Sequence, residues 1–342
     1  MATYDVSSTT GTAPATSGAP TMHRSTTTAL FTALAAAAAL AVPAQAAAPT
    51  VELQPDRLTR GADIAVPHIE EGDFVDGERR VELPGTVASV IGEVADGWLV
   101  GTNNVDRNRN RRVVRVAADG SVTDVLRNLD TSTVVLSADG STLAWQQYVS
   151  GGRKTITYAY DVATATVTGE KGPGPYVTLL DVAADRVVLG AGQRVLQWRP
   201  STGRQRTLVK KAAGSVSIEH DLLSIYTRDP YAGGCTKLVR LSDPGQTVWK
   251  SCRDRIAAFS PDGTQLLTFH ILTDGVGPGE IHLREVDGTK LATWTTNWFS
   301  GWEWESPGTV LLDVNGERRS ATVRCVLAQC EDATDPVKVQ AP

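Results

Sequence analysis

AAFSPDGTQLLTF, residues 257–269, is the stretch that decides the fold. An apolar lead-in runs into Ser-Pro-Asp-Gly, a polar pair follows, and a second apolar run begins. Asp-Gly between two apolar segments is typical of a tight turn that joins antiparallel strands. We therefore expect a β-hairpin over these residues.

The same hairpin pattern recurs along the chain at a spacing of roughly forty residues. Its turns fall at Asp96, Asp139, Asp185, Asp221, Asp262 and Pro307. A second turn signal follows each first one, as at Asp119-Gly120 and Asp287-Gly288, and β-branched or alternating runs flank it. Each repeat is therefore expected to form four short strands, which we call a, b, c and d.

Six such repeats predict an all-β fold, a six-bladed β-propeller. A β-sandwich with irregular hairpins is the alternative, but near-register repeats at this spacing favour the propeller. Seven blades result if residues 51–83 hold more structure than their weak pattern indicates. A ring must cover the open edges of its first and last sheets. We expect an N-terminal strand over residues 79–83 to close the ring as the outer strand of the last blade.

The repeat also resembles a known family. AFSPDGTQLLTF is similar to the PD40 (WD40-like) repeat of TolB-like β-propellers, in which an aromatic residue precedes Ser-Pro-Asp-Gly and an apolar run. LSADGSTLAW, residues 136–145, resembles a second copy. The resemblance implies turn-forming rather than catalytic residues at the matched positions. It also implies either a partner-binding module or a domain appended to a hydrolase. The sequence runs to residue 342 without a G-x-S-x-G nucleophile elbow, so we expect a stand-alone propeller.

The N-terminal 46 residues have the features of a secretory signal peptide. Met22, His23 and Arg24 precede the apolar run ALFTALAAAAALAVPAQA, residues 29–46, which ends in an A-x-A pattern. We predict cleavage after Ala46, a true translation start at Met22, and a secreted protein without a stable membrane anchor. Residues 47–72 would then be an N-terminal extension, and residues 73–342 the propeller.

The four cysteines are consistent with export. Cys235 and Cys252 lie symmetrically about a turn near Asp243, so a hairpin places them nearly opposite each other. Cys325 and Cys330 flank a short loop in the same way. We predict two disulfides; a zinc site, the alternative, would need ligand spacings that do not occur.

The composition excludes several kinds of partner. The formal net charge is −5, which argues against bulk binding to nucleic acid or to an anionic membrane. No histidine or cysteine has a second one at metal-ligand spacing, so we expect neither a metal nor another cofactor. We expect a monomer that binds a protein, peptide or saccharide.

One candidate binding segment is NNVDRNRNRRVV, residues 103–114. Arg107, Arg109, Arg111 and Arg112 crowd a predicted b–c connection, where guanidinium groups can grip carboxylates, sulfates or phosphates. A solvated loop that happens to be basic is the alternative.

Other candidates lie on predicted connections of the same face. RDPYAGGCT, residues 228–236, and TDGVGPG, residues 273–279, are expected b–c loops; they supply Asp229, Tyr231 and Asp274. His270 ends a strand and can reach a loop or the channel; the alternative is a hydrogen bond to a neighbouring loop. Trp298 and Trp302 would form an aromatic platform for sugar rings or a peptide, unless they pack between blades.

These features predict a secreted, non-catalytic propeller that binds a partner through loops on one face. The alternative is an extracellular hydrolase or lyase that acts on a carbohydrate or lactone at the channel mouth. That alternative needs two or three carboxylates or histidines from different blades in the channel.

Overall fold

The hairpin expected over residues 257–269 is formed by strands β21 (Asp254–Phe259) and β22 (Gln265–His270). In its turn the Ser260 hydroxyl donates to Asp262 Oδ1 at 2.6 Å, and Asp262 Oδ1 accepts the Thr264 N–H at 3.1 Å. Gly263 follows with φ of 69°, a left-handed conformation that glycine adopts without steric cost. The Asp-Gly pair therefore makes the turn for the reason that the sequence indicates.

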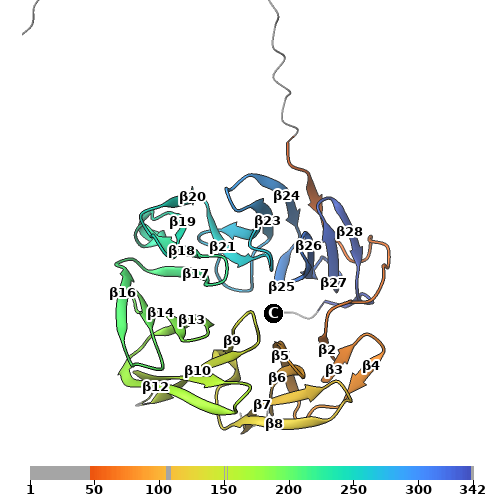
Figure 1. Cartoon of the computed structure of the whole chain (residues 1–342). Coiled ribbons are helices and arrows are strands. Elements are labelled where there is room, and N and C mark those ends of the chain that lie inside the picture. Colours follow the sequence, from red (N-terminus) through yellow and green to blue (C-terminus); the bar gives the residue numbers. More distant parts are fainter. Residues whose placement is uncertain (1–46, 105–108, 150, 152, 340–342) are drawn as a thin grey trace, which may run out of the picture. The chain divides into compact units, whose positions relative to one another are not determined.

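The computed structural model describes residues 47–104, 109–149, 151 and 153–339. These residues form seven consecutive β-sheets, the blades of a propeller ring (Figure 1). We number the blades 1 to 7 in chain order.

Blades 1 to 3 are antiparallel sheets. Blade 1 comprises β2 (His68–Glu70), β3 (Asp73–Asp76) and β4 (Arg79–Val81). Blade 2 comprises β5 (Val87–Val94), β6 (Gly97–Asn104), β7 (Arg109–Ala117) and β8 (Val122–Arg127). Blade 3 comprises β9 (Val135–Leu136), β10 (Thr142–Val149), β11 (Lys154–Asp161) and β12 (Thr166–Pro175).

Blades 4 and 5 have the same four-stranded order. Blade 4 comprises β13 (Thr178–Ala183), β14 (Arg186–Gly190), β15 (Val195–Trp198) and β16 (Gln205–Val209). Blade 5 comprises β17 (Ala213–Ser217), β18 (Leu222–Tyr226), β19 (Thr236–Arg240) and β20 (Thr247–Ser251). Two short 3-10 helices lie in connections: η2 (Thr131–Thr133) and η3 (Pro230–Ala232).

Blades 6 and 7 each carry an added strand. Blade 6 comprises β21, β22, β23 (Glu280–Glu285) and β24 (Lys290–Thr295), with β1 (Thr50–Glu52) parallel to β24. Blade 7 comprises β25 (Trp298–Ser306), β26 (Thr309–Asn315), β27 (Arg319–Val326) and β28 (Gln329–Asp332), with β29 (Val337–Lys338) paired to β27.

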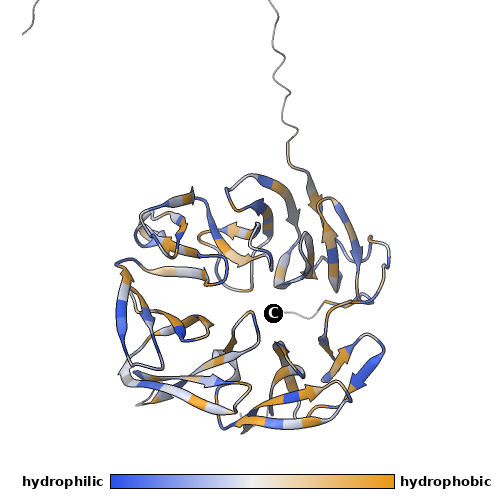
Figure 2. Cartoon of the chain, viewed as in Figure 1, coloured by the Kyte–Doolittle hydropathy of each residue, from blue (hydrophilic) through white to orange (hydrophobic). Residues whose placement is uncertain are grey.

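The blades are arranged around a central axis, where the inner strands of several blades line cavities; we call this central region the channel. Strand a of each four-stranded blade lies innermost (Figure 1), so the b–c and d–a connections share one end of the propeller. We call this end the loop face. The a–b and c–d turns share the other end, the turn face. In Figure 2 the hydrophobic colour follows many of the strands, whereas β16 and the β3–β4 turn are hydrophilic.

The ring has seven blades rather than the six expected first, because residues 68–81 form a blade of their own. The strand predicted over residues 79–83 is β4, which pairs with β3 and not with the last blade. The prediction that it closes the ring was therefore wrong. Residues 47–72 contribute β1 and β2, and Arg60 forms a parallel bridge with Asp332 of blade 7.

The apolar core lies between neighbouring blades. Trp294 of β24 and Phe299 of β25 are buried together between blades 6 and 7, and Leu53 joins them from the segment after β1. Burying such side chains contributes roughly 1.5–3 kcal/mol each. The N-terminal segment is thus fixed to the ring by apolar packing as well as by strand pairing.

Candidate functional site

Exposed apolar side chains are unevenly distributed between the two faces. Seven of the ten large hydrophobic residues that are exposed in the described part of the chain lie at the loop face: Val87, Tyr148, Tyr176, Tyr231, Leu272, Val276 and Val337. The other three lie by c–d turns: Val167, Val326 and Leu327. Contiguous exposed apolar groups mark interaction surfaces, and two of the seven, Tyr148 and Tyr176, are in contact with each other.

Two tyrosines on the loop face stack on each other. Tyr148 near the end of β10 and Tyr176 after β12 have ring centroids 6.1 Å apart and an interplanar angle of 11°. They are 41% and 54% exposed. Partial desolvation, and then the neighbouring Tyr176, raises the pKa of the Tyr148 phenol. The pair offers an aromatic surface that also donates hydrogen bonds.

The two b–c loops expected on this face meet each other. Tyr231, which is 70% exposed, donates its hydroxyl proton to Asp274 Oδ2 at 2.9 Å. Asp229 Oδ1 accepts the Tyr231 N–H at 2.9 Å and caps η3. This contact joins the loop of blade 5 to the loop of blade 6 and brings together three predicted site residues.

A cationic and aromatic group lies behind these loops. The Arg255 guanidinium stands 4.4 Å from the centroid of the Phe269 ring, and Arg255 Nη2 donates to the Thr273 carbonyl at 2.9 Å. Phe269 in turn contacts Trp302 at a centroid distance of 5.4 Å. Arg255 acts on Asp274 and Tyr231 electrostatically, lowering both pKa values as a minor contribution. The loops therefore rest on an ordered base.

His270 and Trp298 are placed beside this base. His270 is exposed, and its Nδ1 accepts the Leu272 N–H at 3.3 Å. Trp298 begins β25 opposite Asn315 and is half-buried, as is Trp302. Among the described residues, Tyr148 and Tyr176 form a stacked exposed pair on the loop face, and the aromatic platform of Trp298 and Trp302 stays a prediction.

Two arginines of the predicted basic segment, Arg111 and Arg112, lie beside acidic residues. Arg112 Nη1 donates to Asp124 Oδ1 at 3.2 Å, and Arg111 Nη1 lies 3.8 Å from Asp130 Oδ2. Arg107 lies outside the described residues, and Arg109 is described only as the first residue of β7. Anion binding by this segment stays a prediction.

Both predicted disulfides are present. Cys235 is bonded to Cys252, and Cys325 is bonded to Cys330. The first ties the end of the Tyr231 loop to the d–a connection after β20. It therefore restrains the part of the loop face where Tyr231 and Asp274 meet.

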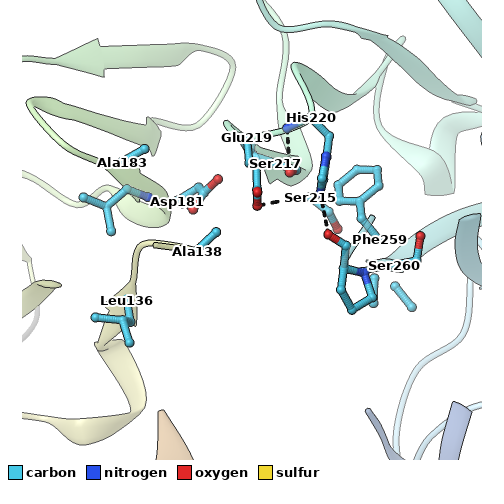
Figure 3. Close-up of a pocket in the computed structure, with 15 residues that line it drawn as sticks. Leu136, Ala138, Asp181, Ala183, Ser215, Ser217, Glu219, His220, Phe259 and Ser260 are labelled. Carbon is cyan, nitrogen blue, oxygen red and sulfur yellow. Dashed lines mark hydrogen bonds and ion pairs between the residues drawn. The ribbon is translucent and has the colours of Figure 1, made fainter. Parts of the chain in front are cut away.

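The channel wall near the turn face contains a cavity of about 340 Å³, shown in Figure 3. Its polar groups largely hold neighbouring blades together. Asp181 Oδ2 accepts the Ile218 N–H at 2.6 Å, and the Ser215 hydroxyl donates to the Ile256 carbonyl at 3.1 Å. Burial raises the pKa of the Asp181 carboxyl. The wall here is a structural seam between blades 4, 5 and 6.

Carboxylates from different elements also meet in the channel beside blade 7. Glu303, Asp313 and His68 line one cavity of about 460 Å³. Glu303 is reached by solvent, but the surrounding protein displaces much of its hydration; this desolvation, followed by the charge of Asp313, raises its pKa. Among the described residues, no three His, Cys, Asp or Glu side chains gather as metal ligands would.

Sequence reasoning missed several of these residues. Tyr148 and Tyr176 are single tyrosines at strand ends, and only the blade register brings them together. Glu303 and Asp313 become neighbours through the β25–β26 pairing. For the two tyrosines, an aromatic residue at the loop-face end of a strand was the available signal.

Comparisons with known proteins give the fold. No model of a known protein family matches the chain, and no curated protein matches it. A chain of the mitotic checkpoint complex is similar, with a TM-score of 0.52 and 16% identity over 82% of this chain and 87% of that chain.

Two further solved structures are similar. The uncharacterized protein lmo1340 from Listeria monocytogenes EGD-e has a TM-score of 0.52 and 12% identity over 73% of this chain and 83% of its own. A prolyl endopeptidase structure has a TM-score of 0.51 and 10% identity over 75% of this chain and 43% of that chain. Sequence identities this low show only that the folds are similar. The resemblance to PD40 repeats stays a prediction.

Proposed function

We propose that the protein is a secreted binding module that holds a protein or other ligand on its loop face. The observation that supports this proposal is the uneven distribution of exposed large apolar side chains: among the described residues seven lie at that face, against three at the turn face. Tyrosine is enriched where binding energy is concentrated, and three of the seven are tyrosines.

Two features support the proposal of secretion. The sequence predicts a signal peptide that ends at Ala46, and two disulfides are more typical of exported proteins than of cytosolic ones. No helix among the described residues is long and apolar enough to cross a membrane. Mass spectrometry of protein recovered from the culture medium tests this part, since the mature chain should begin at Ala47.

Matched surface variants test the binding face. The loop-face variant Tyr148→Ser/Tyr176→Ser/Tyr231→Ser and the turn-face variant Val167→Ser/Val326→Ser/Leu327→Ser each remove three exposed apolar side chains. Partners captured from culture supernatant should be lost from the first variant and kept by the second. Equal capture by both variants, or loss from the turn-face variant alone, would overturn the proposal.

A hydrolase or lyase is the second candidate, and Glu303 favours it. This carboxyl has a raised pKa, which suits a general acid, and it shares a cavity with Asp313 and His68 from other strands. Turnover of a panel of chromogenic glycosides and lactones, lost in Glu303→Gln, would support this candidate. A panel without turnover would leave the binding module as the function.

A further inference from the structure

Blade 1 lacks an inner strand. The six other blades contain strands a to d, whereas blade 1 contains only β2, β3 and β4. β4 leads into β5 at the loop face and is therefore strand d, which makes β2 the equivalent of strand b. The place beside β2, where strand a would stand, belongs to no strand of the described chain.

The edge of β2 that faces this place can accept another strand. β2 and β3 are joined by the two-residue turn Glu71-Gly72, with φ values of 53° and 94°. In such a hairpin the two residues that flank the turn are joined by two backbone hydrogen bonds. The next pair of opposite residues, one step further from the turn, forms no backbone hydrogen bond with each other. That next pair is Ile69 and Phe74, so the N–H and C=O of Ile69 point away from β3.

A cavity occupies the place of the missing strand. It has a volume of about 460 Å³ and is lined by β2 (His68, Ile69), by β5 (Ser89, Val90) and by β25 (Trp302, Glu303). Strands β5 and β25 are the inner strands of the two neighbouring blades. The cavity therefore lies between the neighbours that a first inner strand would have, and it shares Asp313 with a larger hollow of about 830 Å³.

The charge of the cavity indicates which kind of peptide segment can bind there. Its described lining contains three carboxylates, Glu70, Glu303 and Asp313, and no lysine or arginine. Glu70 is already paired with Arg80 at 2.7 Å. Glu303 and Asp313 have no ion pair among the described contacts, although Asp313 Oδ1 accepts the Thr322 hydroxyl at 2.8 Å.

The β25–β26 register brings these two carboxylates onto the same side of blade 7. Gly301 pairs with Asp313, and Glu303 pairs with Leu311, so the two acids are diagonal neighbours. A Cβ atom on Gly301 would stand 2.3 Å from Asp313 Oδ2; the glycine therefore leaves room for the Asp313 carboxylate. Desolvation by the surrounding protein and the charge of Asp313 raise the pKa of Glu303, and a cation beside the pair would relieve the repulsion between the two carboxylates.

We propose that the cavity beside β2 binds an extended, basic peptide segment of a partner, which adds to β2 as the missing inner strand of blade 1. Strand addition provides backbone hydrogen bonds through Ile69, and alternate side chains provide specificity. Every second side chain of the bound segment would face blade 7, where a lysine or arginine would contact Glu303, Asp313 and the Trp302 ring. The side chains between them would face Ser89 and Val90 of blade 2, where small apolar residues fit. None of the seven exposed apolar side chains of the loop face lines this cavity, so either proposal can fail alone.

Fluorescence anisotropy with three labelled hexapeptides tests the proposal. Alternating Lys-Val should bind to the full chain, alternating Glu-Val should not, and Lys-Val with N-methylated backbone amides should bind at least tenfold more weakly. The last peptide keeps the charge but cannot form the strand ladder. Equal binding of the methylated peptide, or no binding of Lys-Val at 1 mM, would overturn the proposal.

Matched charge variants locate the site. Glu303→Gln/Asp313→Asn should weaken Lys-Val binding about tenfold, whereas Asp229→Asn/Asp274→Asn, the same charge change on the loop face, should change it less than twofold. Because the first variant can also lose stability, hydrogen exchange on the wild-type chain gives a second readout. The Ile69 amide should exchange at least tenfold more slowly with Lys-Val bound, and an unchanged rate contradicts strand addition.

Discussion

The Tyr231 hydroxyl donates to the Asp274 carboxylate at 2.9 Å, and this single contact joins the loops of two neighbouring blades. The hydrogen bond to Asp274, and then its charge, raises the pKa of the Tyr231 phenol, while the same bond lowers the pKa of Asp274. Each pKa therefore reports whether the loops are in contact.

Asp274→Asn should lower the pKa of the Tyr231 phenol towards its ordinary value, because a neutral amide stabilises the protonated phenol less than a carboxylate does. NMR of ring-labelled tyrosine across the alkaline range measures the shift. Asp287→Asn, an exposed turn aspartate of the same blade, is the control and should leave Tyr231 unchanged. An unshifted Tyr231 in Asp274→Asn would show that the loops do not meet in solution.

Two glycines of the blade 6 loop should respond differently to alanine. A Cβ atom at Gly277, φ 130°, would lie 2.1 Å from the Phe299 carbonyl oxygen, whereas one at Gly275, φ 73°, would meet no atom within 4 Å. Gly277→Ala must therefore push the loop off β25, and we expect a cost of about 2–4 kcal/mol in the free energy of unfolding. Gly275→Ala carries only the left-handed penalty of about 1–2 kcal/mol. Urea unfolding of both variants measures this difference. Equal losses in the free energy of unfolding would mean that the loop does not pack on Phe299.

The two disulfides should contribute unequally to stability. Cys235 and Cys252 are 17 residues apart, and Cys325 and Cys330 only 5. Chain entropy gives about 3 kcal/mol for the longer loop and about 2 kcal/mol for the shorter one. The paired replacements Cys235→Ala/Cys252→Ala and Cys325→Ala/Cys330→Ala, compared by urea unfolding, should follow this order. The reverse order would show that packing around Cys325, which is fully buried, outweighs loop entropy.

Asp332 should make the protein less stable as the pH rises from about 4 to about 6. Its side chain is 1% exposed, its Oδ1 has no hydrogen-bond partner in the described structure, and burial raises its pKa to about 6. Below the unfolded pKa, near 4, the carboxyl is protonated in both states and costs nothing. Between the two values only the unfolded state ionises, so the free energy of unfolding falls.

Asp332→Asn removes this penalty. It should be more stable than the wild type at pH 7 by on the order of 2 kcal/mol, and equally stable near pH 4. Urea unfolding at the two pH values measures the difference, with the exposed Asp287→Asn as control. A variant that is less stable than the wild type at pH 7 would contradict a buried, unpaired carboxylate.

The sequence predicts the repeat better than it predicts the ring. Turns such as Asp139-Gly140 and Asp262-Gly263 need a left-handed residue, so local chemistry marks the a–b hairpins of blades 2 to 7. Blade 1 lacks this sequence signal because it has no strand a and therefore no a–b turn. Its turns at Glu71-Gly72 and Gly77 have another spacing.

The candidate site is predictable only where one loop carries several of its members. The loops of Asp229, Tyr231 and Asp274 are correctly placed on one face, because b–c connections always share an end. The ion pair of Arg112 with Asp124 and the nearness of Glu303 to Asp313 depend on strand register. In both hairpins a β-bulge shifts the register, between Trp304 and Ser306 and between Val113 and Val114, and the turn residues alone do not reveal such a bulge.

The pairing of Thr50 with Thr293 has a consequence for the order of assembly. β1 is the first strand of the described chain, yet the edge that receives it is completed only when β24 has been made. Contacts between residues so far apart in sequence form late and slowly. The earliest-made strand must therefore wait unpaired until the first six blades are available, and its docking joins the start of the described chain to blade 6.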